Sequence, residues 1–208
     1  FRLVGSEMCI RDRMNVERET QHTKDLYGVG DPKCDHFARQ CLLARRMVEE
    51  GVRFVQIYSG GMENQRSWDG HNDIQGNHTQ FAGETEKPTA ALLTDLEERG
   101  LLEDTLVIWC GEFGRLPTAQ VASKPGRDHN PHCFTAWLAG GGIKGGVSYG
   151  ESDDIGYKAA VDRVHLNDLH ATLLHLLGLE HERLTYRYNG RDFRLTDVAG
   201  RVIREILA

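Results

Sequence analysis

Apolar positions along the chain follow two periods, and each period predicts a different kind of element. A step of three or four residues, typical of a helix with one buried face, runs over residues 35–51 through Phe37, Cys41, Ala44 and Val48. Residues 89–100, 167–177 and 196–208 show the same kind of stripe. We therefore expect helices over these four segments, with Thr85 capping the second and Pro88 in its first turn.

Short apolar runs rich in β-branched and aromatic residues alternate with these helices. They cover residues 52–58, 105–110 and 134–140, and a hairpin is expected where Asn189-Gly190 divides residues 185–195. Helices that alternate with buried strands are typical of an α/β chain with a mainly parallel sheet. Between the first strand and the helix at 89–100 lies a polar loop, long enough to suggest a functional role.

Composition narrows the class of protein. The 208 residues carry a formal net charge of −6, and we find no Lys/Arg run with interleaved aromatics, so a nucleic-acid-binding protein is disfavoured. No apolar stretch reaches the length of a membrane-spanning helix. The 5 cysteines include no CxxC pair and indicate neither a disulfide framework nor a zinc ribbon. Residues 1–13 do not match the rest of the chain in character and are interpreted as non-native, leaving 14–208 as part of one domain.

Polar side chains gather where the expected strands end. Because ligands of open α/β sheets bind outside the carboxyl ends of the strands, these clusters are candidates for one site. Imidazole and carboxylate groups are the ligands of zinc, manganese or iron hydrolase centres. The candidates are Asp69, His71, Asp73, His78, Glu112, Asp128, His129 and His132. The alternatives are a solvated loop around "SWDGHND", a Glu112–Arg115 turn, and an Asx-turn at Asp128.

Several of these stretches together resemble a known family. "WDGH", "GEFGR" and "GRDHN", with "DLHATLLHLLGLEHERLTYRYNGRDFRLTDV", resemble the bacterial sulfatase-like proteins of domain of unknown function 1501, in the form abundant in planctomycete-type bacteria. The resemblance covers residues 25–208. It implies an alkaline-phosphatase-like α/β/α sandwich, of which this chain is the C-terminal portion, with divalent metals at the strand ends.

The resemblance also implies roles for particular residues. Asp69 and His71 would form the first ligand pair, His129 a later ligand, and Glu112 would stand where the superfamily carries an Asp. The chain departs from the pattern at Phe113, because the relatives carry a metal-binding His there and a phenyl ring cannot ligate a metal. The family likeness further implies export, and a nucleophile upstream of this fragment.

The expected function is hydrolysis of a sulfate or phosphate ester with a divalent metal ion; zinc, manganese and calcium are not distinguished. Arg115 and Arg127 are candidates for binding the anionic oxygens of the substrate, although Arg115 could equally pair with Glu112. His78, Asp128 and His132 are secondary ligand candidates. Two alternatives stay open. One is a non-catalytic exported scaffold that binds a glycan or protein partner, and the other is an inactive fragment.

Overall fold

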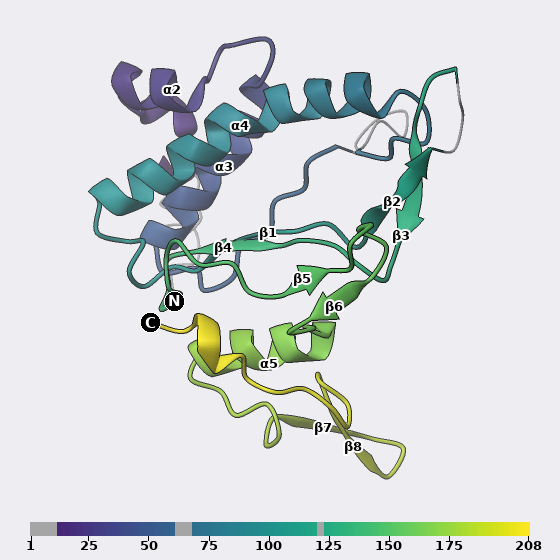
Figure 1. The fold of residues 1–208 in the computed structure, drawn as a ribbon. Coiled ribbons are helices and arrows are strands. Elements are labelled where there is room, and N and C mark those ends of the chain that lie inside the picture. Colours follow the sequence, from purple (N-terminus) through teal and green to yellow (C-terminus); the bar gives the residue numbers. More distant parts are fainter. Residues whose placement is uncertain (1–11, 61–67, 120–122) are drawn as a thin grey trace, which may run out of the picture. The chain divides into compact units, whose positions relative to one another are not determined.

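The computed structural model of the protein describes residues 12–60, 68–119 and 123–208. The segment interpreted as non-native lies almost wholly outside these residues. The chain divides into two compact units, one formed by residues 1–105 with 119–128 and the other by residues 106–118 with 129–208. Helices build most of the first unit, and short strand pairs with one helix build most of the second (Figure 1).

In the described part of the first unit, a 3-10 turn, η1 (Val16–Arg18), is followed by three helices. They are α2 (Gln21–Tyr27), α3 (Asp35–Glu49) and α4 (Ile74–Glu98). Helix α3 packs along α4, and α2 packs against both. The buried side chains include Tyr27, Ala38, Cys41, Leu42, Phe81 and Leu96. The helix expected over 35–51 is therefore confirmed over Asp35–Glu49. Of the predicted stripe, Cys41 and Ala44 are buried, whereas Phe37 and Val48 are half-buried.

Helix α4 begins fifteen residues before the expected start of its apolar stripe. Asp73 caps it, because its Oδ1 accepts a hydrogen bond from the Gly76 amide at 3.2 Å. Thr85 is not a cap: it is buried within the helix, and its hydroxyl donates to the Phe81 carbonyl at 2.9 Å. Pro88 lies inside the helix rather than in its first turn. The second half of the expected polar loop is thus helical.

The segment 52–58, expected to be the first strand, forms no strand. It leaves Phe54 77% exposed and Tyr58 68% exposed. A β-rich composition describes a chain that suits a pleated surface, but it cannot supply the neighbouring strand that completes the hydrogen bonds. The element prediction was wrong here because the described residues place no strand beside this segment.

Every sheet among the described residues has two strands, so the expected parallel sheet and alkaline-phosphatase-like sandwich are contradicted. The strands are β1 (Val107–Trp109), β2 (Gly114–Ala119), β3 (Arg127–Asn130), β4 (Trp137–Ala139), β5 (Glu151–Ser152), β6 (Ala159–Val161), β7 (Thr185–Tyr188) and β8 (Arg191–Arg194). Strand β1 pairs antiparallel with β4, β5 with β6, and β7 with β8. An apolar run suits parallel and antiparallel pairing alike, so residues 105–110 did not determine the direction of pairing. The expected burial of this strand is also wrong, since Ile108 in β1 is 36% exposed.

The second unit also holds helix α5 (Leu166–Leu176) and the 3-10 turn η2 (Arg204–Ile206). His165 caps α5, and the Asp168 carboxylate accepts a hydrogen bond from the His165 amide at 2.9 Å. The helix expected over 196–208 is wrong. Hydrogen bonds to side chains of α5 hold this segment irregular instead: Arg201 N donates to Asp168, and Ile203 N donates to Thr172.

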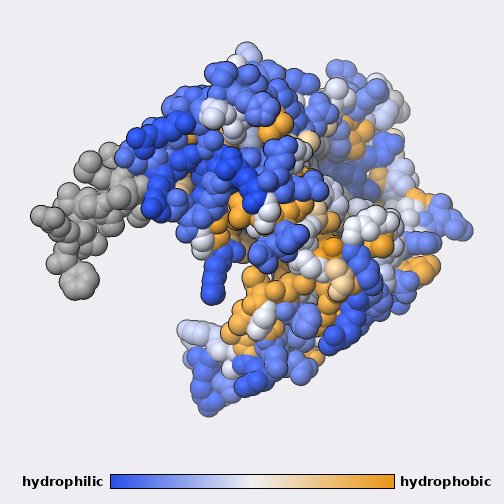
Figure 2. Space-filling view, turned by 90° about the vertical axis from the view of Figure 1, so that its left-hand side faces the viewer, coloured by the Kyte–Doolittle hydropathy of each residue, from blue (hydrophilic) through white to orange (hydrophobic). Residues whose placement is uncertain are grey.

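Hydrophobic surface remains exposed in the second unit. Figure 2 shows it in the lower part of the view, which holds α5, β7 and β8. Leu177 and Leu195 are examples, at 60% and 58% exposed. The hairpin β7–β8, expected from Asn189-Gly190, is confirmed, with Asn189 at φ 46° and Gly190 at φ 79°. Among the described residues, no helix has the length and apolar character to cross a membrane.

Candidate metal-ligand site

Two motifs far apart in the sequence are joined by backbone contacts in the first unit. Asn72 forms an antiparallel bridge with Pro125, and the Arg127 amide at the start of β3 donates to the Gly70 carbonyl at 2.9 Å. The Ile74 amide donates to the Pro125 carbonyl at 3.1 Å. "WDGHND" is thereby held against "PGRDH", as the hypothesis of a site assembled from separate motifs requires.

Gly126 makes this close approach sterically possible. A Cβ atom at this position would lie 1.8 Å from the carbonyl oxygen of His71 and 2.5 Å from the Asn72 amide nitrogen. These are backbone atoms, which cannot move aside as the end of a flexible side chain can. No role was predicted for Gly126 from the sequence. The signal that could have identified it is its place beside candidate ligands, where a backbone often needs room.

The loop places His71 between two carboxylates. Its Nε2 lies 3.0 Å from Asp69 Oδ1, and its Nδ1 lies 3.8 Å from Asp128 Oδ1. The side chains of His71, Asp69 and Asp128 are 33%, 44% and 52% exposed. Water and small solutes can therefore reach the group. A ligand site requires such access, whereas a sealed structural cluster does not allow it.

His129 comes directly after Asp128 on strand β3. One ligand atom each of Asp69, His71 and His129 lie within 4.8 Å of one another. Imidazole nitrogen and carboxylate oxygen at such spacing suit the first coordination shell of a zinc or manganese ion. These are three of the four residues predicted as primary ligands, and the structure brings them together; that they hold a metal stays a prediction.

The ring of His129 packs against Phe113, with 4.2 Å between the ring centroids and 37° between the planes. Phe113 precedes β2, in the "GEFGR" motif. This contact fixes the orientation of the imidazole without competing for its nitrogen atoms. The phenyl group at a position where a ligand was expected thus has a packing role beside a candidate ligand.

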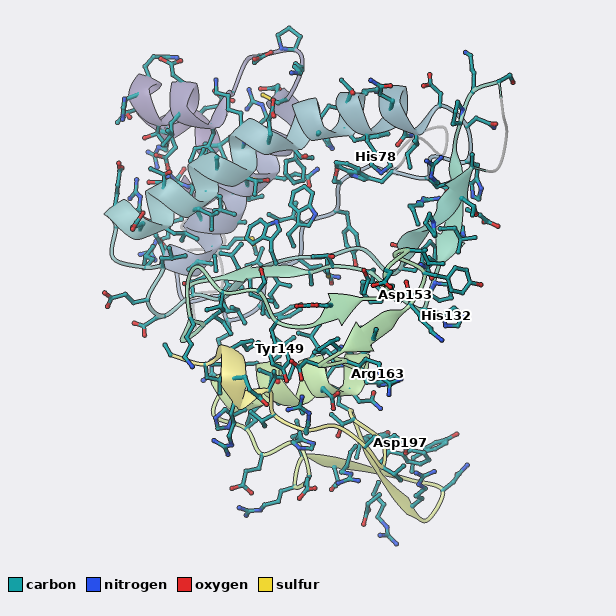
Figure 3. All side chains as sticks on the ribbon, in the orientation of Figure 1. His78, His132, Tyr149, Asp153, Arg163 and Asp197 are labelled. Carbon is teal, nitrogen blue, oxygen red and sulfur yellow. The ribbon has the colours of Figure 1, made fainter. Side chains whose placement is uncertain are left out.

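The remaining predicted site residues do not join the converging group. Glu112, His78, Asp128 and His132 are outside it within the described part of the chain. Figure 3 shows His78 on α4 and His132 on the loop after β3. His132 is exposed, and its amide is tied to Asn130 Oδ1 at 3.1 Å. Its predicted role as a substitute ligand has no support from this geometry.

The two arginines proposed for substrate binding lie on strands β2 and β3. Arg127 directly precedes Asp128, and its Nη1 donates to the Gly126 carbonyl at 2.9 Å. Arg115 lies on β2, and its side chain is half-buried. Each has an N–H fork suited to a sulfate or phosphate group. Their role in binding such a group stays a prediction.

A different cluster, centred on Arg45 in α3, was not predicted from the sequence. An arginine on a helix is ordinarily solvated, but Arg45 is 2% exposed and lies near Glu19, Glu49 and Asp95. The signal was its spacing of three and four residues from the buried Leu42 and Cys41. Because its charge partners come from the protein itself, we assign this cluster a structural role.

The fold and the geometry define an α/β chain with a group of candidate metal ligands, one on strand β3 and two in the loop that contacts it. The chain belongs to the DUF1501 family of proteins of unknown function, whose family model matches residues 2–207. No curated protein and no solved structure matches it. The family part of the resemblance is confirmed. The likeness to sulfatases and alkaline phosphatases has no support from these comparisons, and the described strands do not form the parallel sheet that it implied.

Proposed function

We propose that the protein binds a divalent metal ion through Asp69, His71 and His129 and takes part in hydrolysis of anionic esters. The observation that carries the proposal is the convergence of their three ligand atoms within 4.8 Å. The donor set is one carboxylate and two imidazoles, as in several catalytic zinc centres that keep a further position open for water or substrate. The partial exposure of Asp69 and His71 allows such a ligand to enter.

The chemistry of the residues suggests a division of roles. When bound, a divalent ion would polarise an ester oxygen and stabilise the negative charge that develops on it. Arg127, next to Asp128 on β3, would bind the non-bridging oxygens of a sulfate or phosphate group, and Arg115 is a second candidate. We assign Glu112 no ligand role, and we assign no nucleophile among the described residues.

Metal binding is the first test. The purified chain would be titrated with Zn²⁺ and with Mn²⁺ beside a His129→Ala variant and a His132→Ala control, since His132 is exposed and outside the converging group. We expect about one ion per chain in the parent and in the control, with binding reduced at least tenfold in His129→Ala. Equal binding by all three proteins, or none by the parent, would contradict the proposed site.

Ester hydrolysis is tested separately, with 4-nitrophenyl sulfate and 4-nitrophenyl phosphate as probes. Turnover that depends on added metal and is lost in His129→Ala would support the hydrolase. Stoichiometric metal binding without turnover would favour the scaffold alternative, in which the site binds a partner. The packing of Phe113 on His129 is the observation that keeps this alternative open, since a phenyl ring adds no ligand and no proton-transfer group.

A further inference from the structure

The two ring nitrogens of His71 have different surroundings, and this difference suggests a role for Asp128. Nε2 lies beside Asp69, which belongs to the converging group, and Nδ1 lies beside Asp128, which does not. An imidazole can offer only one nitrogen to one metal ion. The nitrogen on the side of Asp69 is the one placed to bind an ion shared with that carboxylate.

We infer that Asp128 is a positioning residue, which accepts the Nδ1–H of His71 and so presents Nε2 to the metal. The inference rests on the proposed metal site. The sequence predicted Asp128 as a secondary metal ligand, and the inferred role is a different one. Carboxylates that hold the second nitrogen of a metal-bound histidine fix its tautomer and its ring orientation, and they make the imidazole a better donor.

Backbone contacts explain how Asp128 reaches this place. The Arg127 amide donates to Gly70, and Gly126 allows the backbone of His71 to lie directly against the strand. Asp128 directly follows Arg127, whose amide is hydrogen-bonded to Gly70, and this bond holds the carboxylate beside the His71 loop. The separation of 3.8 Å between Nδ1 and Oδ1 is longer than a hydrogen bond. A small rotation of the half-exposed Asp128 side chain would close it when an ion fixes the imidazole.

Asparagine at position 128 is the sharpest test, because it keeps the shape of the side chain and removes its charge. Zn²⁺ affinity would be measured by competition with a chromogenic chelator for the parent, Asp128→Asn, Asp128→Glu, Asp69→Asn and the control Asp154→Asn, an exposed aspartate. We expect Asp128→Asn to bind about 10–100-fold more weakly at unchanged stoichiometry, with partial recovery in Asp128→Glu. Asp69→Asn should lose more, and Asp154→Asn should match the parent.

Nitrogen NMR of the zinc-loaded chain gives a readout that a purely structural role would not produce. The shifts of the His71 ring distinguish a metal-bound nitrogen from a protonated one. We expect Nε2 bound to zinc and Nδ1 carrying a proton that exchanges faster with water in Asp128→Asn. Zinc on Nδ1, or an affinity of Asp128→Asn within twofold of the parent, would overturn the inference while leaving the metal site intact.

Two other outcomes separate this inference from the proposed function. If Asp128→Asn loses stoichiometric binding as Asp69→Asn does, Asp128 is a ligand and the positioning role is wrong. If the parent binds no zinc, the proposed function fails, and the inference fails with it. The parent titration therefore decides the first proposal and the variants decide the second.

Discussion

Two clusters of charged side chains in the first unit differ in how they are satisfied. Around Arg45, Nη2 lies 2.8 Å from Glu19 and Nε lies 2.9 Å from Asp95, while Nη1 meets Glu49. Around His71, two carboxylates face one imidazole, and all three side chains are about one-third exposed or more. The first cluster is closed to solvent by its own partners, whereas the second has room for an external ligand.

The pKa values of the buried cluster reflect its closed surroundings. Burial alone would raise the pKa of Glu19, but hydrogen bonds from Arg46 and Arg45, together with their charges, outweigh it and hold the pKa below its ordinary value. Tyr27 donates to Asp95 at 3.0 Å, and burial together with that carboxylate raises the pKa of the phenol. The lowered pKa of Glu19 corresponds to stabilisation of the folded chain at neutral pH. We therefore expect the buried cluster to determine stability and the open cluster to determine binding.

The largest effect should come from removing the buried guanidinium. Arg45→Met removes the buried counterion that Glu19, Glu49 and Asp95 share and leaves them, among the described residues, only Arg46 and Arg99 as cationic partners. We expect a loss of about 3 kcal/mol in the free energy of unfolding. Arg39→Met is the matched control on the same helix, because its partners Asp35 and Glu17 are partly exposed. The control should cost less than about 1 kcal/mol. Urea unfolding measures both, and equal losses would refute the distinction between the clusters.

Gly126→Ala should damage the open cluster instead. The added methyl group would overlap the backbone of His71, so the loop must move away from β3. We expect at least tenfold weaker Zn²⁺ binding and a loss of about 1–3 kcal/mol in stability. Gly145→Ala is the control, since a Cβ there meets nothing within 4 Å. Unchanged zinc affinity in Gly126→Ala would show that this backbone contact does not shape the site.

Alkaline pH should weaken the helical core through Cys41. Burial raises the pKa of this thiol to about 12, above the value of about 8.5 for an exposed thiol. The neutral thiol therefore stabilises the fold fully below that exposed value, and the contribution is lost as pH rises towards the folded pKa. Stability should fall by about 1.4 kcal/mol per pH unit above about pH 9.

Unfolding measured from pH 7 to 10 tests the slope, with Cys41→Ala as the variant and Cys110→Ala as the exposed control. The slope should be reduced only in Cys41→Ala, whatever offset the smaller side chain introduces. Tyr27 steepens the fall only above about pH 10, where an exposed phenol ionises. A steep slope that persists in Cys41→Ala below pH 10 would assign the alkaline sensitivity to another group.

Local patterns in the sequence predicted what local physics determines. The stripe through Cys41 and Ala44 specified α3, and Asn189-Gly190 specified the hairpin β7–β8, because both signals act within a few residues. The strand predicted over 52–58 was wrong because a strand depends on a partner that can be distant in the sequence. The burial of Arg45 was not predicted, because an arginine is usually exposed and only the carboxylates that fold onto it allow its burial.

The candidate site was predicted in its residue types and only partly in its geometry. Asp69, His71 and His129 carry the right ligand atoms, and the structure brings them together. Glu112 lies outside the group, although its motif is next in the chain, because motif order does not measure distance. The two His71 nitrogens have separate environments because the backbone of His71 lies directly against Gly126. No pattern of residue types in the sequence predicts this contact.

The smallest expected effect concerns Phe113 and the orientation of His129. Phe113→Ala removes the ring that packs 4.2 Å from the imidazole, and such aromatic contacts contribute about 0.5–1.5 kcal/mol. Zn²⁺ affinity should fall about 2–10-fold, since the imidazole of His129, no longer packed against Phe113, must lose rotational freedom when it binds the ion. Phe113→Leu, which keeps apolar bulk, should lie between this variant and the parent. Tighter binding in Phe113→Ala would mean that the phenyl ring obstructs the ion, and the open cluster would then be held back by its neighbour rather than shaped by it.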